Sequence, residues 1–120
     1  MDNKVIGKAG EQAAADYLRS KGCEILARNY RVALGEIDLI AREGQTLVFV
    51  EVKTRRSVRC GRPAAAVNYY KQQKISRVAA VFLRQRHLWG CPCRFDVVEV
   101  YCVGEQLEVR QIKGAFEAAL

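Results

Sequence analysis

Two acidic residues stand where a buried strand would not ordinarily carry charge. Asp38 interrupts the apolar segment 37–40, and Glu51 ends the apolar segment 47–50. If the residues around Gly44 form a hairpin turn, with paired positions that sum to about 89, Asp38 lies directly opposite Glu51. Two adjacent carboxylates repel and raise each other's pKa unless a cation lies between them. A hard divalent ion such as Mg²⁺ or Mn²⁺ would supply that positive charge.

The residues that follow Glu51 add two further groups to this pair. Because side chains alternate along a strand, Lys53 falls on the same face as Glu51 and Val52 on the other. A metal ion held by Asp38, Glu51 and the backbone carbonyl of Val52 would polarise a phosphodiester and lower the pKa of an attacking water. Lys53 would orient that water or stabilise the charge that develops on the phosphate. The pattern Asp-x12-Glu-x-Lys has the spacing of the PD-(D/E)XK nuclease signature, although a surface salt bridge at a sheet edge is the alternative interpretation.

Glu11 is a third candidate acid, in a segment with helical periodicity. Gly7 and Gly10 precede it, and such small residues let a helix approach a sheet or a phosphate closely. Periodicity places Glu11 near the apolar stripe of the helix, from which its carboxylate would reach the other two acids. The alternative is a solvated glutamate near the start of a helix, where the helix dipole favours negative charge. The residues alone leave these two interpretations open.

The positive charge of the chain is concentrated in its middle. There are 20 Lys and Arg against 13 Asp and Glu, a net charge of +7. Yet the segment Val52–Phe95 contains no acid at all. An acid-free basic block indicates a polyanionic partner, here nucleic acid and most simply DNA. Its candidate contacts are Arg55, Arg56, Arg59, Arg62, Lys71 and Lys74.

The rest of the sequence predicts one α/β domain, residues 1–120, with a mixed sheet and the order α-β-β-β-α-β-β. The expected helices span 4–21 and 63–86, the second beginning at Pro63. The expected strands span 23–32, 36–40, 47–53, 94–101 and 106–111, and the tail 114–120 is expected to form a helical turn or to fray. The absence of a long apolar segment predicts no membrane association, and five cysteines without a secretory signal predict a reducing cytoplasm. A zinc site at His87, Cys91 and Cys93 lacks an evident fourth ligand, which favours idle thiols.

Several motifs, in order, resemble the YraN family of small bacterial proteins over nearly the whole chain. They are Gly7-x-x-Gly10-Glu11, Tyr17-Leu18, Arg28-Asn29-Tyr30, Gly35-Glu36-Ile37-Asp38-Leu39-Ile40, Phe49-Val50-Glu51-Val52-Lys53 and Arg94-Phe95-Asp96-Val97. The resemblance implies a restriction-endonuclease-like fold, similar to that of archaeal Holliday-junction resolvases. It implies Glu11, Asp38, Glu51 and Lys53 as active-site positions, and a homodimer as one arrangement, although no dimer seam is visible in the sequence. It assigns no role to Asp96, which would simply pair with a nearby Arg.

The function that these features favour is a metal-dependent nuclease that hydrolyses phosphodiester bonds in DNA, with branched or damaged duplexes as candidate substrates. The alternative is a nucleic-acid-binding protein that keeps the nuclease fold without hydrolysis. A third functional class, a basic structural partner of ribosomes or membranes, is supported only by the net charge.

Overall fold

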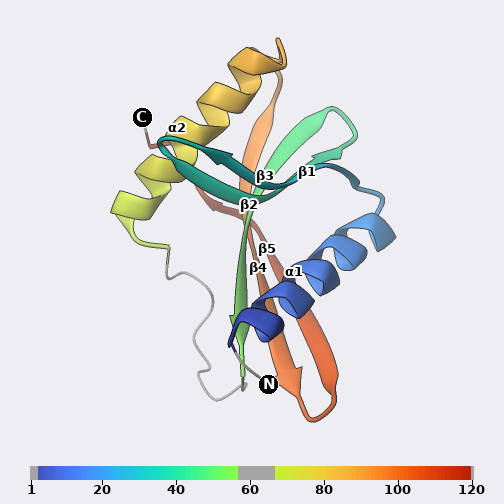
Figure 1. Cartoon of the computed structure of the whole chain (residues 1–120). Coiled ribbons are helices and arrows are strands. Elements are labelled where there is room, and N and C mark those ends of the chain that lie inside the picture. Colours follow the sequence, from blue (N-terminus) through green and yellow to red (C-terminus); the bar gives the residue numbers. More distant parts are fainter. Residues whose placement is uncertain (1–2, 57–66, 120) are drawn as a thin grey trace.

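The computed structural model describes residues 3–56 and 67–119, which form one mixed sheet with a helix on each face (Figure 1). The α/β class and the predicted order α-β-β-β-α-β-β are confirmed. The elements are α1 (Asn3–Ser20), β1 (Glu24–Val32), β2 (Gly35–Glu43), β3 (Thr46–Arg55), α2 (Tyr69–Gln85), β4 (Cys93–Val103) and β5 (Gln106–Phe116). None of the helices in the described ranges has the length and apolar character that crossing a membrane requires.

The five strands lie in the sheet in chain order, β1-β2-β3-β4-β5. Neighbouring strands are antiparallel except β3 and β4, which are parallel and are connected through α2. Between β2 and β3 the paired residues run from Glu43 opposite Thr46 to Leu39 opposite Val50. These positions sum to 89, as the sequence predicted, so the side chains of β2 and β3 share faces in the expected register.

Each helix covers a separate apolar core, and Figure 1 shows the two helices on opposite faces of the sheet. The even-numbered residues of β3 pack against α1, which contributes Ala14 and Leu18 to this core. The odd-numbered residues of β3 pack against α2, which contributes the fully buried Phe82 to the second core. The apolar stripe predicted for the second helix is confirmed for four of its five members, Ile75, Val78, Ala79 and Phe82, which are buried on α2. The fifth, Val67, is buried in the same cluster but precedes the helix. A strand that is apolar on both faces is therefore the central strand of the sheet.

The start of α2 differs from the prediction. The helix begins at Tyr69 rather than at Pro63, which itself lies outside the described residues. Asn68 has an extended backbone, and its side chain accepts a hydrogen bond from the Lys71 N–H at 2.8 Å. Asparagine is among the strongest N-cap residues because its side chain satisfies an otherwise orphaned N–H. This cap sets the beginning of the helix.

The C-terminal segment also differs, because the helical turn expected after residue 113 is wrong. β5 continues to Phe116 through an irregularity opposite Asp96, where the register with β4 shifts. Gly114 adopts a φ of +60° there, and its N–H donates to the Asp96 carboxylate at 3.0 Å. A glycine at positive φ thus turns the strand around a buried acid instead of ending it.

Candidate functional site

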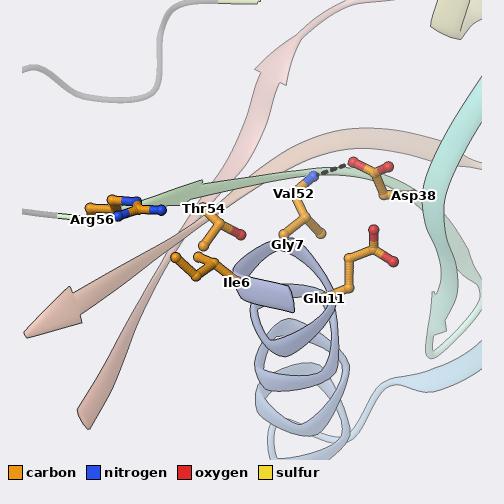
Figure 2. A pocket seen from close by; sticks show the side chains of 7 residues that line it. All are labelled: Ile6, Gly7, Glu11, Asp38, Val52, Thr54 and Arg56. Atoms are coloured by element: carbon orange, nitrogen blue, oxygen red, sulfur yellow. Dashed lines mark hydrogen bonds between the residues drawn. The ribbon is translucent and has the colours of Figure 1, made fainter. Parts of the chain in front are cut away.

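The candidate site lies where β2 and β3 separate. Their backbone pairing ends at Leu39 and Val50. Beyond that pair, the Val52 N–H donates to the Asp38 carboxylate at 2.8 Å, as Figure 2 shows. A side chain has therefore replaced the backbone acceptor that β2 no longer provides. We call this point, defined by Asp38 and Val52, the fork of the sheet.

Asp38 lines two hollows, one on each side of the fork. The α1-side hollow has a volume of about 290 Å³ and lies between the first half of the helix and the end of β3 (Figure 2). Its lining residues are Ile6, Gly7, Glu11, Asp38, Val52, Thr54 and Arg56. The α2-side hollow has a volume of about 280 Å³. Its lining residues are Gly35, Glu36, Asp38, Glu51, Lys71, Lys74 and Ile75.

The Asp38 carboxyl group keeps its proton up to an unusually high pH. Burial, followed by the negative charge of Glu51, raises its pKa from 3.8 to about 7. The hydrogen bond from Val52 lowers the pKa, but Glu11 and Glu36 add further negative charge and raise it. Burial and the neighbouring acids thus both favour the neutral, protonated form of Asp38. Such a group is a candidate for binding an external cation or for moving a proton near neutral pH.

Glu51 has a cationic partner that the sequence did not assign to it. The Lys71 ammonium lies 2.6 Å from a Glu51 carboxylate oxygen, and the Glu51 side chain is only 9% exposed. Burial acts to lower the pKa of Lys71, but the hydrogen bond and charge of Glu51 outweigh it, and the pKa is raised above its ordinary value. Lys71 therefore stays protonated beside Glu51 and occupies the α2 side of the acidic pair.

Glu11 reaches the fork from the opposite face. Its side chain rises from α1 toward Asp38 in Figure 2, and its charge contributes to the raised pKa of Asp38. The close approach of the helix depends on Gly10, since a Cβ there would lie 2.0 Å from the Thr54 hydroxyl oxygen. The prediction that small residues bring this helix close to the sheet is therefore confirmed for Gly10. A Cβ at Gly7 would meet nothing within 4 Å, because Gly7 borders open space in the hollow.

Lys53 lies apart from both hollows. It follows Glu51 by two residues along β3, on the same face, and pairs across the parallel ladder with the fully buried Glu99. Within the described ranges its ammonium makes no ion pair, unlike the Lys71 ammonium. Glu99 instead interacts with Arg55, whose guanidinium lies 3.4 Å from one of its carboxylate oxygens.

The six basic residues predicted to contact nucleic acid fall into three groups. Arg55 and Lys71 are engaged in ion pairs with buried acids, while Arg56 and Lys74 line the two hollows. Arg59 and Arg62 lie outside the described residues. The members of this set that line the hollows at the fork are Arg56 on the α1 side and Lys71 and Lys74 on the α2 side.

The donor set at the fork fits a hard divalent cation, but only through a small number of protein ligands. In an extended strand the N–H and C=O of one residue point to the same edge, so the Val52 carbonyl faces the gap in which Asp38 lies. Two carboxylates and one carbonyl are oxygen donors of the kind that Mg²⁺ accepts, with water completing its coordination. In the part of the chain that the structure describes, no three His, Cys, Asp or Glu side chains group closely enough to hold a metal by themselves.

Lys71, Glu36 and Thr54 are site residues that sequence reasoning did not single out for these positions. Lys71 had a visible signal, because it lies four residues before Ile75 and so on the sheet-facing side of the helix. A lysine on that side requires an acidic partner. Thr54 had no such signal, since its place beside Gly10 depends on how the helix crosses β3.

Comparison with known proteins identifies relatives along almost the whole chain. Residues 10–100 match the family described as "Uncharacterised protein family UPF0102". A UPF0102 protein of Caldicellulosiruptor saccharolyticus is 48% identical over 97% of this chain and 100% of its own length. A second, from Symbiobacterium thermophilum, is 51% identical over 94% of this chain and 97% of its own length. Among solved structures, Pyrococcus furiosus SfsA in complex with Ca²⁺ is similar with a TM-score of 0.41 and 18% identity, over 93% of this chain and 62% of that chain.

Proposed function

The chain belongs to the UPF0102 family, the YraN family of the sequence resemblance, and from the geometry of the fork we propose that it is a metal-dependent nuclease that hydrolyses DNA. The observation that carries the proposal is the shared hollow of Asp38 and Glu51, in which Asp38 has a pKa of about 7. A structural pair of acids would be neutralised by the protein. Among the described residues Glu51 has an ion-pair partner and Asp38 has none, which is the state expected of ligands for an external divalent ion.

Asp38, Glu51 and the Val52 carbonyl would hold Mg²⁺ or Mn²⁺, which supplies Lewis acidity toward a phosphate oxygen and an acidified water. The chain's own residues would position the DNA around them. Arg56 in the α1-side hollow and Lys74 in the α2-side hollow would each hold a phosphate oxygen, as cations on either side of the scissile group.

Glu11 and Lys53 would assist at the reacting atoms. Glu11 faces Asp38 across the α1-side hollow and would accept a hydrogen bond from a water held there. Lys53 lies on the Glu51 face of β3 and makes no ion pair among the described residues, so its ammonium would be available for charge that develops on the phosphate. Both roles require the phosphate to lie over the end of β3.

The test is a cleavage screen with purified protein and Mg²⁺ or Mn²⁺ on duplex, single-stranded, flap and four-way DNA. Asp38→Asn, Glu51→Gln and Lys53→Ala should each reduce the hydrolysis rate by about 10²–10³ or more, because each removes charge at the reacting centre. Glu108→Gln, on the exposed surface of β5, is the matched control and should keep wild-type activity. Activity that survives all three site substitutions would contradict the proposal and point to a contaminating nuclease.

One observation favours a second candidate function, a DNA-binding protein without hydrolysis. The Lys71 ammonium already neutralises Glu51 at 2.6 Å, so this acid is satisfied without a metal ion. If this candidate is right, the wild-type protein binds DNA in the screen but cleaves none of the substrates with either metal. Divalent ions would then also fail to raise the melting temperature.

A further inference from the structure

Two tyrosines at the start of α2 are exposed, although one face of the helix is buried in the core. Tyr69 and Tyr70 are 63% and 66% exposed, whereas Ile75 and Phe82 of the same helix are buried in the core. In the described ranges, Trp89 is the other strongly exposed aromatic residue, at 66%, and it lies beyond the opposite end of α2. The tyrosine rings therefore contribute little to the core of the domain and are available to a ligand.

Of the tyrosine pair, Tyr69 and Tyr70, the second adjoins the α2-side hollow through Lys74. The Lys74 ammonium lies 5.1 Å from the centre of the Tyr70 ring, one helical turn further along. Lys74 lines that hollow together with Lys71, whose ammonium contacts Glu51. The Tyr70 ring, the two ammonium groups and the acids of the fork thus follow one another, with Tyr69 beside Tyr70 in the chain.

This order of groups matches the chemistry of an unpaired nucleotide. Lysine ammonium groups neutralise phosphates, and aromatic side chains stack on bases without regard to their identity. Inside a duplex both faces of a base are covered by its neighbours, so only an unpaired or terminal base presents a free face to a tyrosine. A strand with a phosphate over Lys74 would therefore place its unpaired bases against the tyrosine pair.

We propose that Tyr69 and Tyr70 form a stacking platform for unpaired bases of a DNA strand, which makes DNA with single-stranded nucleotides the preferred ligand. The inference rests on the proposed function, because it places the bases beside the phosphate that the fork would hold. It narrows the substrate from DNA in general to DNA with an unpaired segment at the site.

The experiment measures binding in EDTA, so that no hydrolysis is needed. The probes are a fluorescein-labelled oligothymidylate of about 12 nucleotides and a fully paired duplex of about 24 base pairs, which has no loop and few terminal bases. Binding is followed by fluorescence anisotropy. The proteins are wild type, Tyr69→Ala/Tyr70→Ala, Tyr69→Phe/Tyr70→Phe and Trp89→Ala. Urea unfolding of each variant checks that the fold is retained.

The double alanine variant should lose about tenfold or more in affinity for the single strand, because it removes base stacking. It should lose less than about threefold for the duplex and keep its salt dependence, because the phosphate contacts remain. The double phenylalanine variant keeps the rings and should bind like wild type, and Trp89→Ala should match wild type on both probes.

Equal losses on both probes, or no loss on either, would overturn the stacking platform. Such a result would instead make the exposed tyrosines a protein-docking surface. The two proposals fail separately. If DNA is cleaved with Mn²⁺ but the tyrosine variants bind normally, only the stacking proposal is wrong; if selective single-strand binding is seen without any cleavage, only the nuclease proposal is wrong.

Discussion

Asp38 and Asp96 are both acids within the sheet, and they differ in how the protein satisfies them. Asp96 is fully buried and accepts four hydrogen bonds at 2.8–3.0 Å, two from Arg94, one from the Gln111 side chain and one from the Gly114 N–H. Among the described residues Asp38 accepts one, from the Val52 N–H at 2.8 Å.

The charges around Asp96 and Asp38 also differ. Asp96 and Glu43 hold the pKa of Arg94 above its ordinary value, chiefly through the hydrogen bonds of Asp96, so a cation is fixed beside the acid. Asp38 is surrounded by further acids and has a raised pKa. The Arg-Phe-Asp motif thus pairs its acid with a fixed cation, whereas Asp38 has no ion pair with any residue that the structure describes. A buried acid is a candidate for function when its partners are missing, not merely when it is buried.

The largest expected effect is on the structural acid. Asp96→Asn removes the negative charge that Arg94 faces and turns an amide N–H₂ toward donors, so the free energy of unfolding should fall by about 3–5 kcal/mol. Urea titration at pH 8 measures it. Asp16→Asn, an exposed acid of α1 that lies 3.7 Å from Arg19, should change stability by less than about 0.5 kcal/mol. A loss at Asp96 no larger than at Asp16 would remove the distinction between the two acids of the sheet.

At the fork, removal of the acid should raise the free energy of unfolding, whereas removal of Asp96 should lower it. The pKa of Asp38 is about 7 in the folded chain, against 3.8 ordinarily, so between these values the folded state binds a proton that the unfolded state has lost. Stability from this group is complete below about pH 4 and is lost as the pH rises through 7. Asp38→Asn keeps an acceptor for the Val52 N–H without the charge, and should be more stable than wild type by about 2–4 kcal/mol at pH 8.

At pH 4 the same substitution should change stability by less than about 1 kcal/mol, because Asp38 is protonated in the folded state and only about half ionised in the unfolded state. Urea unfolding of both proteins across pH 4–8, in EDTA, gives the comparison. A variant that is less stable than wild type at pH 8 would show that the protein does neutralise Asp38 after all.

The smallest expected effect concerns Lys71, the cation that competes for Glu51. Lys71→Met keeps the length of the side chain but removes the ammonium, and should tighten Mn²⁺ binding by about three- to tenfold at pH 8, because a nearby positive charge is lost. Lys113→Met is the matched control, since its ammonium lies 3.5 Å from Glu43 in the other acidic cluster. Isothermal titration calorimetry should show no change for the control. Weaker Mn²⁺ binding by Lys71→Met would mean that this lysine supports the metal site.

Much of this arrangement was predictable because it depends on local pattern. The apolar run before Glu51 identified the central strand, and the turn at Gly44 fixed the register that places Asp38 one position beyond the last pair. The start of α2 was mispredicted because Pro63 is a good first helical residue in isolation, whereas the cap at Asn68 decides where the helix begins. The end of β5 was missed because Gly114 resembles a breaker in the sequence, and its acceptor, Asp96, lies 18 residues away.

The site itself was less predictable than the fold. The sequence offered Lys53 as the cation beside Glu51, by spacing along one strand, but the helix on that face supplies Lys71 instead. Which lysine reaches a given acid depends on how α2 crosses the sheet, and this crossing follows from the packing of the whole core rather than from the spacing of charges.

The position of Asp38 at the fork has a consequence for communication between the faces of the sheet. One carboxylate belongs to both hollows, so a ligand on the α1 side and the Lys71 ammonium on the α2 side act on the same charge. A cation that binds Asp38 from the α1 side weakens the electrostatic attraction between Asp38 and the Lys71 ammonium. Displacement of Lys71, in turn, increases the affinity of Asp38 for the cation. Thermodynamic reciprocity makes these two coupling free energies equal. A sheet that elsewhere separates two cores joins them electrostatically at this one residue.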